Sequence, residues 1–390
     1  QEDFIKQYKW IDQLKLRLGY GVTGNSAINP YQTKGSIVSL FYPFGSAATA
    51  GYTTYDQSLS NGAVTMANQD LSWEKTKQWN VGVDFNFLSN RINGSFDIYT
   101  SRTSDLLMLQ NIPSLTGYVQ TYNNIGETKN FGYDVTLNLV PVRTKDLEWS
   151  IDLNAAYTKN EIVSLANGKE DDIANGWFIG QSTYVLYDYV PNGVWKAEDA
   201  EEMAKFNANG SNFQVGMTRP KDLNGDYKID ANNDRAVAGR NRDPRWSIGV
   251  STTVVYKEWE LSVQAYGRMG YTFSNEAPWV GGRYNCRLYD YYNENNTNAT
   301  YSKPIFDEGG KDQYYYLCGI KSGSYMKIRN ISLGYTFPKS LLKNSGIANL
   351  KLYAQAKNPF TLFNKAESVD MDTQSNLYNQ GFTFGVNISF

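Results

Sequence analysis

Apolar and polar residues alternate strictly in ten segments of this 390-residue chain. In the segment 14–22, for example, apolar residues at the even positions alternate with Lys15, Arg17 and other polar or small residues at the odd positions. Because successive side chains of an extended strand point to opposite faces, the pattern predicts β-strands with one apolar and one polar face. The segments are 14–22, 79–87, 92–100, 133–139, 149–157, 246–256, 259–265, 331–337, 350–356 and 382–390. The chain is therefore predicted to be all-β.

Composition and charge exclude other classes of protein. No run approaches 18 consecutive apolar residues, so a transmembrane helix is excluded, whereas a membrane β-barrel exposes only every second residue to lipid and is not excluded. The 30 Tyr, 18 Phe and 9 Trp favour strands, and the 33 Gly favour turns between them. With a net charge of −2, the chain has no long-range field that would hold nucleic acid, which is not an expected partner.

The connections between these segments alternate between short and long. The short ones are 88–91, 142–148, 257–258 and 338–349, and the long polar ones are 25–75, 196–245 and 271–323. If each strand reverses the direction of the one before it, all short connections fall at one end, as in outer-membrane barrels with short turns inside and long loops outside. The same parity requires an even number of crossings between residues 157 and 246. We assign two, at 183–195 and a weaker 212–218, which gives about twelve strands.

Aromatic residues lie at the ends of many segments, and the last segment is strongly apolar on one face. Rings such as Trp79, Trp149 and Trp246 are expected where a strand crosses a membrane–water interface. A terminal strand this apolar favours aggregation unless it is paired or closed into a ring. Its apolar face consists of Phe382, Phe384, Val386, Ile388 and Phe390. We predict an antiparallel transmembrane β-barrel that this strand helps to close, with a soluble carbohydrate-binding β-sandwich as an alternative.

Two sets of residues are candidates for contact with a transported molecule. The polar faces of the strands are expected to line the lumen, and aromatic rings in the long connections suit stacking on sugars or gripping of peptides. The lumen candidates are Lys15, Arg17, Asn80, Asp84, Asp134, Asn138, Asp152, Asn154, Glu260 and Gln264. The candidates for contact with substrate or with a lid are Trp177, Tyr184, Trp279, Tyr284, Tyr289, Tyr291, Tyr292, Tyr314, Tyr315 and Tyr316. For the aromatic set, packing of the loops on themselves or an interfacial belt is the alternative.

The chain contains no histidine, so catalytic triads and histidine-containing zinc sites are impossible within it. Two cysteines cannot form a four-cysteine metal site, and no pair of carboxylates stands out as a glycosidase pair. An enzyme is therefore not expected. Cys286 and Cys318 lie in the same long connection, where a disulfide is possible and two separate thiols are the alternative.

Residues 222–234 resemble an EF-hand-like calcium loop, in which alternating oxygen ligands surround a hard cation. The candidate ligands are Asp222, Asn224, Asp226, Lys228 through its carbonyl, Asp230 and Asp234. Two departures weaken the match: Tyr227 replaces the turn glycine, and Asn233 stands at position 12 with Asp234 one place late. A solvated Asp- and Asn-rich turn is the alternative to a calcium site.

Several phrases, in this order, resemble the SusC-like (SusC/RagA) TonB-dependent outer-membrane transporters. They are LKLRLGYGVTGN (14–25), LSWEKTKQWNVGVDF (71–85), NNIGETKNFGYDVTLN (123–138), DLNGDYKIDANNDR (222–235), YMKIRNISLGYTFP (325–338) and GFTFGVNISF (381–390). The resemblance implies a 22-stranded barrel around an N-terminal plug. Since members of the family are much longer, it also implies that residues 1–390 are the C-terminal part of the barrel, without the plug domain and the first strands.

The same resemblance implies a function and partners. Such a protein would import an oligomeric nutrient, a glycan or a peptide, through the outer membrane. A SusD-like surface lipoprotein would cover the outer mouth, and TonB would supply energy through an N-terminal region missing from this chain. No cofactor is implied beyond the calcium considered above. A passive porin or a surface adhesin remains the alternative from a different functional class.

Overall fold

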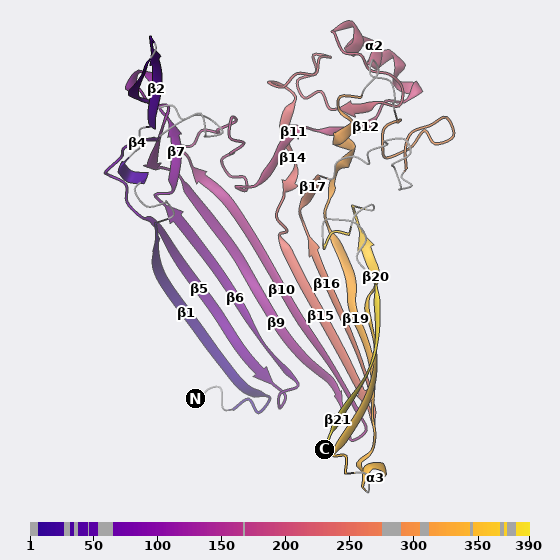
Figure 1. Ribbon diagram of the computed structural model, residues 1–390. Helices are drawn as coiled ribbons and strands as arrows, with labels where there is room; N and C mark the ends of the chain where they lie inside the picture. The colour runs from indigo at the N-terminus through magenta and orange to yellow at the C-terminus, as the bar shows by residue number, and fades with distance from the viewer. Residues whose placement is uncertain are drawn as a thin grey trace.

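The computed structural model describes residues 7–26, 32–34, 38–45, 47–53, 65–166, 168–274, 290–304, 312–343, 346–366, 370–372 and 380–390. Its main feature is one sheet of ten long strands, each antiparallel to its neighbours (Figure 1). In sheet order, which is also chain order, they are β1 (Ile11–Asn25), β5 (Glu74–Phe87), β6 (Ile92–Ser104), β9 (Glu127–Arg143), β10 (Leu147–Ser164), β15 (Trp246–Tyr256), β16 (Trp259–Met269), β19 (Tyr325–Thr336), β20 (Asn349–Asn364) and β21 (Gly381–Ser389). The ten predicted strands are confirmed.

The two further crossings predicted at 183–195 and 212–218 are not part of this sheet. β10 pairs directly with β15, from Leu147 opposite Tyr256 to Tyr157 opposite Trp246, so no strand crosses between them. Those segments contribute to separate small sheets, in which β11 (Val185–Tyr189) pairs with β14 (Arg235–Asn241) and β12 (Pro191–Val194) pairs with β13 (Thr218–Pro220). Strands this short cannot cross a bilayer, which needs about 9–11 residues. The sheet of the described residues has ten strands, and zero crossings also satisfy the parity.

The register places apolar side chains on one face of the sheet and polar side chains on the other. Leu16 lies opposite Val83, which lies opposite Phe96, and the next row carries Arg17 and Asp97 instead. Large apolar side chains stay exposed on the apolar face, as in Leu18, which is 73% exposed. An apolar surface this large needs an apolar neighbour, because water does not solvate it favourably.

Two bands of aromatic rings border the apolar face, and we call them the outer and the inner girdle. In the outer girdle Tyr20 packs on Trp79 with ring centroids 4.6 Å apart, and the band continues through Phe131, Tyr133, Tyr157 and Trp246. In the inner girdle Trp259 lies 4.9 Å from Tyr335. From Trp246 to Tyr256, β15 spans about 33 Å at ~3.3 Å per residue, or about 25 Å in height at a tilt of ~40°. This is the height of the lipid-facing band of an outer-membrane barrel.

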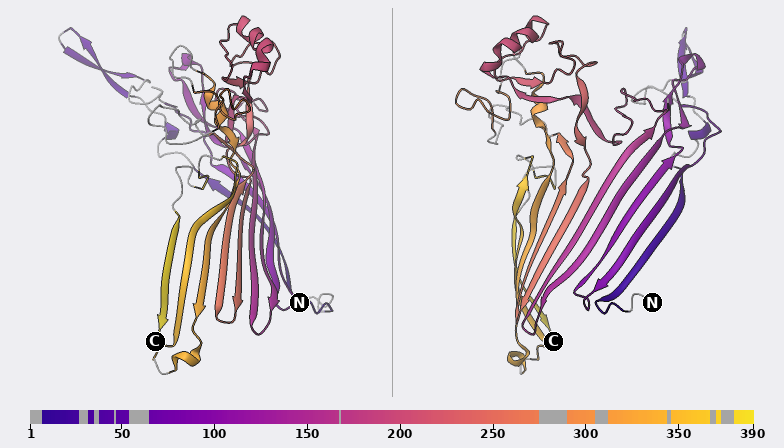
Figure 2. Two further views of the ribbon diagram at one scale, coloured as in Figure 1. Left: turned by 90° about the vertical axis from the view of Figure 1, so that its right-hand side faces the viewer. Right: turned by 180° about the vertical axis from the view of Figure 1, so that it is seen from behind.

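The two ends of the sheet differ. At one end are the short turns and α3 (Lys339–Leu342), and at the other end are all the remaining elements (Figures 1 and 2). Those outer elements, besides the ones already named, are η1 (Gln32–Lys34), β2 (Val38–Phe44), β3 (Ala47–Thr53), β4 (Thr65–Met66), β7 (Leu107–Asn111), η2 (Ser114–Thr116), β8 (Gln120–Asn124), η3 (Ala197–Asp199), α2 (Ala200–Ala208), β17 (Thr272–Ser274), η6 (Tyr315–Gly319) and β18 (Ile320–Ser322). Among the described helices, none has the length and apolar character to span a membrane.

A charge on the apolar face should destabilise the protein far more than the same charge on the neighbouring polar position. Val250 lies near the middle of β15 on the apolar face, and Ser251 follows it on the polar face. We expect Val250→Arg to cost about 2–4 kcal/mol at the bilayer midplane and Ser251→Arg to cost less than about 1 kcal/mol. Guanidinium unfolding of the full-length protein from liposomes measures both. Equal losses for the two variants would contradict the assignment of faces.

Candidate functional site

The polar face of the sheet carries a network of charges centred on Arg17 of β1. Its Nη2 atom lies 2.8 Å from Asp84 Oδ1 on β5 and 2.7 Å from Asp97 Oδ2 on β6. Asp97 is two strands away, and Arg17 reaches it across Gly82, which lies opposite both residues. A Cβ atom at Gly82 would lie 2.7 Å from Arg17 Nη2, so the glycine is what leaves room for the guanidinium. Arg17 and Asp84 were predicted to line the lumen, whereas Asp97 was missed.

The other predicted lumen residues lie on the same polar face. Asp97 stands directly opposite Asp134 on β9, and Asn138 donates a hydrogen bond to Asp152 on β10. Farther along the sheet, Lys351 Nζ lies 2.8 Å from Glu260 Oε2. The polar face therefore carries charged and amide groups along its length, as the lumen-facing side of a membrane β-barrel does.

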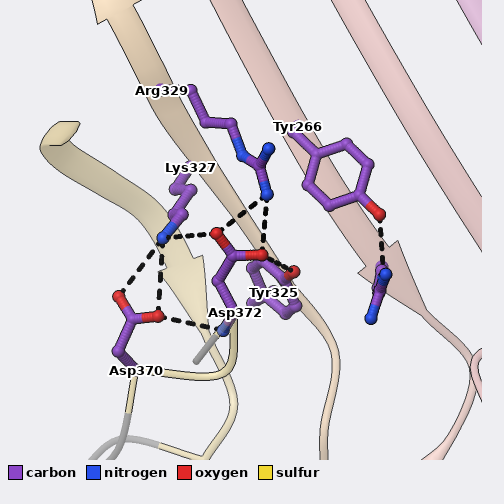
Figure 3. Close-up of polar contacts among 7 residues, drawn as sticks. Tyr266, Tyr325, Lys327, Arg329, Asp370 and Asp372 are labelled. Carbon is purple, nitrogen blue, oxygen red and sulfur yellow. Dashed lines mark hydrogen bonds and ion pairs between the residues drawn. The ribbon is translucent and has the colours of Figure 1, made fainter. Parts of the chain in front are cut away.

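At the outer end of this wall, Asp370–Asp372 lies against the polar face of β19, and we call these three residues the strap (Figure 3). Lys327 Nζ is 3.3 Å from Asp370 Oδ2 and 3.0 Å from Asp372 Oδ2, and the lysine is only 3% exposed. Arg329 Nη2 donates to both carboxylate oxygens of Asp372, at 2.7 and 2.8 Å. Because β20 separates β19 from β21, a segment that joins β20 to β21 crosses β20 to make these contacts.

Apolar contacts and a tyrosine complete the attachment of the strap. Met371 is buried with Tyr271 and Tyr325, and the Tyr325 hydroxyl donates to Asp372 Oδ1 at 3.1 Å. Burial by itself would raise the pKa of Asp372, but Lys327, Arg329 and the Tyr325 hydroxyl outweigh it and hold that pKa below its ordinary value. The stabilisation from Asp372 is therefore complete above about pH 4 and is lost as the pH falls through the lowered pKa.

The outer end of β15 and β16 carries a module with its own apolar core. Trp195 is fully buried, and its ring centroid lies 5.5 Å from that of Phe206 and 5.3 Å from that of Phe213. Arg219 stacks over Trp195 at 4.5 Å, and its guanidinium pairs with Glu202 at 2.6 Å. Tyr314 and Leu317, from the other long outer connection, belong to the same core. The two connections therefore fold together into one unit rather than into separate loops.

The aromatic residues predicted to contact substrate or a lid differ in how far they are buried. Tyr292 and Tyr314 are buried in the outer module, as the alternative of loop packing requires. Tyr316 donates its hydroxyl to Asp188 at 3.0 Å, and burial together with this contact raises its pKa well above the ordinary value. The residues that keep an exposed ring are Tyr184, Tyr291 and Tyr315. Trp279, Tyr284 and Tyr289 lie outside the described residues.

Trp177 and Tyr184 come together in one groove of the outer part, with a volume of about 710 Å³. Arg242 stacks over the exposed Tyr184 ring at 4.8 Å. The other polar groups that line this groove include Asn175, Asn232 and Arg235, which no sequence pattern singled out. Rings next to amide and guanidinium groups provide stacking surfaces and hydrogen-bond donors together, which suits a polar oligomer.

Backbone amides of the calcium-like loop donate hydrogen bonds to its carboxylates. Asp222 accepts hydrogen bonds from the amides of Gly225 and Tyr227, at 2.7 and 2.9 Å, and Asp226 accepts one from Lys228 at 2.8 Å. Tyr227 has a φ of 59°, the left-handed conformation that the usual glycine would take at no steric cost. Asp230 accepts hydrogen bonds from Asn233 and Asn232, which lower its pKa.

Asp234 is placed behind this loop and not at its centre. It is fully buried, and its two oxygens accept hydrogen bonds from the amides of Leu223 at 2.9 Å and Asp230 at 2.8 Å. It therefore ties the beginning of the loop to its end. Within the described residues no group of three or more Cys, Asp or Glu side chains is arranged to hold a metal ion. Calcium binding by this loop stays a prediction.

Within the part of the chain that the structure describes, Cys318 is a free and buried thiol that lies 3.2 Å from Thr218 Oγ1 and packs with Val194, Tyr292 and Tyr301. Burial raises its pKa, so the unreactive thiol form is favoured. Cys286 lies outside the described residues. The structure therefore describes only the Cys318 half of the predicted disulfide.

Comparison with known proteins identifies the family. Residues 7–358 match the model described as "TonB dependent receptor-like, beta-barrel". The chain belongs to this family. TonB-dependent receptor P3 of Formosa agariphila is 28% identical over 93% of this chain and 36% of its own length, and TonB-dependent receptor SusC of Bacteroides thetaiotaomicron is 27% identical over 100% and 38%. A structure of the RagAB peptide importer in its open-open state superimposes with a TM-score of 0.74 at 22% identity, over 100% of this chain and 41% of that one.

Membership in the TonB-dependent receptor family has two consequences. The ten strands are part of a transmembrane β-barrel of the bacterial outer membrane, and the soluble β-sandwich is excluded. The family consists of transporters rather than enzymes. The chain spans less than half the length of the relatives that it matches.

The strap of this TonB-dependent receptor barrel should detach when its carboxylates are neutralised. In a Met371→Cys background, Asp370→Asn with Asp372→Asn neutralises the two carboxylates that pair with the buried Lys327, which costs a few kcal/mol. We expect a water-soluble maleimide to label the introduced thiol at position 371 at least about 10-fold faster in this variant. The matched control is Asp146→Asn with Asp243→Asn, two exposed carboxylates elsewhere. Unchanged labelling of the strap variant would show that the charges do not hold the segment.

Two variants of the calcium-like loop separate its structural carboxylate from its candidate ligands. Asp234→Asn replaces a buried acceptor of two amide hydrogen bonds and should destabilise the loop by about 1–3 kcal/mol, seen as faster cleavage by trypsin after Lys228 or Arg235. Asp226→Asn, on the exposed side, should leave the calcium-free cleavage rate unchanged. Protection by calcium in the wild type but not in Asp226→Asn would establish the metal site. If calcium protects neither protein from trypsin, the loop is a solvated turn and not a calcium site.

Proposed function

We propose that this chain forms part of the wall of a SusC-like channel, which imports an oligomeric nutrient, a glycan or a peptide, by TonB-dependent active transport. The observation that carries the proposal is the charged polar face opposite a lipid-facing band, centred on Arg17, Asp84 and Asp97. Such a wall surrounds a polar path through the bilayer. Relatives named TonB-dependent receptor, SusC among them, support the energy source, and the fold shared with the RagAB peptide importer supports the architecture.

The proposal includes partners outside this chain. In the described sheet β1 and β21 are the two edges and do not pair with each other, so further strands are needed to close the ring. We assign those strands, a plug and the segment that engages TonB to the rest of a longer protein, of which residues 1–390 are the C-terminal barrel part. A SusD-like surface lipoprotein would cover the mouth next to the outer module. The proposed role includes no catalysis.

Energy dependence separates active import from the alternative of a passive porin or adhesin. Cells that carry the full-length protein should take up the nutrient, and a protonophore that dissipates the proton-motive force should stop this uptake. The purified protein in liposomes should not cause swelling in oligosaccharide or peptide solutions, because a plug fills the lumen. Uptake that persists with the protonophore, together with liposome swelling, would establish a porin and overturn the proposal.

The groove at Trp177 and Tyr184 is the proposed outer contact for the substrate. Loss of one stacked ring costs about 0.5–1.5 kcal/mol, so we expect Trp177→Ala or Tyr184→Ala to raise the KM for uptake by about 2- to 10-fold with little change in the maximal rate. Trp73→Ala removes another exposed ring outside the groove and serves as the matched control. An equal change in KM for all three variants would show that the groove does not contact the substrate.

A further inference from the structure

Four neighbouring strands carry basic side chains that form one band across the sheet. We call Lys77 of β5, Arg102 of β6, Lys129 of β9 and Lys159 of β10 the basic stripe. Lys77 stands directly opposite Arg102, and Arg102 stands directly opposite Lys129. Because neighbouring strands are about 4.8 Å apart, the stripe extends over about 15 Å. Like charges placed directly opposite each other on a sheet repel, and the two carboxylates near the stripe offset only two of its four positive charges.

The basic stripe lies on the lipid-facing side of the wall. Lys77 is paired with Val22, the last apolar residue of the β1 face that contains Leu14, Leu16 and Leu18. Direct partners in a sheet point to the same side, so Lys77 and the residues paired with it point away from the lumen. The stripe therefore cannot bind cargo within the channel.

The outer girdle fixes the depth of the stripe in the membrane. Along their strands, Lys77 lies two residues outward from Trp79 and Lys129 two residues outward from Phe131, whereas Lys159 stands directly opposite Phe131, at the outer edge of the girdle. Two residues correspond to about 6–7 Å along a strand. Since aromatic girdles lie at the boundary between acyl chains and headgroups, the stripe lies at the level of the headgroups of the outer leaflet.

The cations of the stripe are more exposed than the carboxylates near them. The Arg102 side chain is 59% exposed and its partner Glu127 only 23%, and Lys129 is 45% exposed against 25% for Glu161. Lys129, Lys159, Phe131 and Glu161 line a pocket of about 190 Å³. Lys159 Nζ is 2.7 Å from Glu161, which lies between the two lysines. An approaching headgroup thus meets positive charge first.

We propose that the basic stripe binds the phosphate groups of a phosphorylated glycolipid in the outer leaflet, of the lipid A type. Lys129 and Lys159 would hold one phosphate at the pocket, and Arg102 would bind a second through its planar guanidinium. Phe131 and Trp79, one level deeper, would contact the acyl chains. The occupant is a lipid because lipid is what surrounds a barrel wall at this depth. The inference concerns the contact of the wall with its membrane and goes beyond the proposed import function.

Native mass spectrometry of the full-length protein in detergent tests the proposal with lipid A and dephosphorylated lipid A as probes. Each cation near a lipid surface contributes roughly five-fold to binding, so the variant with Lys77, Arg102, Lys129 and Lys159 all replaced by Gln should bind lipid A about 600-fold more weakly. The wild type should bind dephosphorylated lipid A as weakly as this variant binds lipid A.

The matched control removes four cations from the inner end, with Lys145, Lys257, Lys339 and Lys343 replaced by Gln, and should bind lipid A as the wild type does. If the quadruple stripe variant does not assemble, the four single variants serve instead, each with a loss of about five-fold. Equal binding of lipid A by wild type and stripe variants would overturn the proposal, as would equal binding of the two probes by the wild type. Displacement of lipid A by inorganic phosphate would make the stripe a small-anion site and overturn the lipid assignment.

Discussion

The pairing of backbone groups between neighbouring strands determines most other features of this structure. In lipid no water is available for an unpaired amide or carbonyl, so a strand that crosses the membrane must satisfy all of them through its neighbours. Pairing fixes the register, and a shift of one residue would move Leu16, Val83 and Phe96 from the lipid side to the lumen. Between β15 and β16 the register is fixed by the tight turn at Lys257 and Glu258, in which Lys257 has a φ of 52°. The polar wall, the girdles and the basic stripe all follow from it.

The outer module is stabilised in a different way, by the burial of apolar side chains away from water. Trp195 and Leu317 are fully buried there, whereas much of the apolar surface of the sheet is exposed and faces lipid. Two polar residues, Thr218 and Asp312, are buried beside this core and are hydrogen-bonded to each other. Asp312 accepts hydrogen bonds from the amides of Thr218 and Tyr314, which joins the two outer connections at a second point.

The membrane part could be predicted well from the sequence and the outer part poorly, for a physical reason. Period-2 alternation is a local signal, so all ten strands and the two faces could be read from it, and Arg17 and Asp84 were placed on the correct side. The pairing of Arg17 with Asp97 depends on the missing side chain of Gly82 on the strand between them, and no local pattern reports such a gap. The predicted count of about twelve strands was too high. The two extra segments met the parity requirement, but they pair in small separate sheets outside the membrane.

Contacts between distant segments account for the rest of what the sequence did not predict. Lys327 and the strap are 43 residues apart in the chain, and Trp195 meets residues of another long connection. The sequence showed the spacing of a calcium loop but not the burial of Asp234 behind it. That burial depends on the hydrogen bonds by which Asp234 joins the beginning of the loop to its end. Such contacts are decided by packing, which the pattern of a single sequence does not report.

One face of the ten-stranded sheet contacts lipid and the other faces the polar lumen, and spin labels can distinguish the two environments. The labels are placed one at a time at positions 246–256 of β15, in the full-length protein in liposomes. The even positions, from Trp246 to Tyr256, should be relaxed mainly by lipid-soluble oxygen, and the odd positions mainly by a water-soluble nickel complex. We expect this alternation along the whole strand. Equal access of the nickel complex to even and odd positions would show that the sheet does not separate lipid from water in this way.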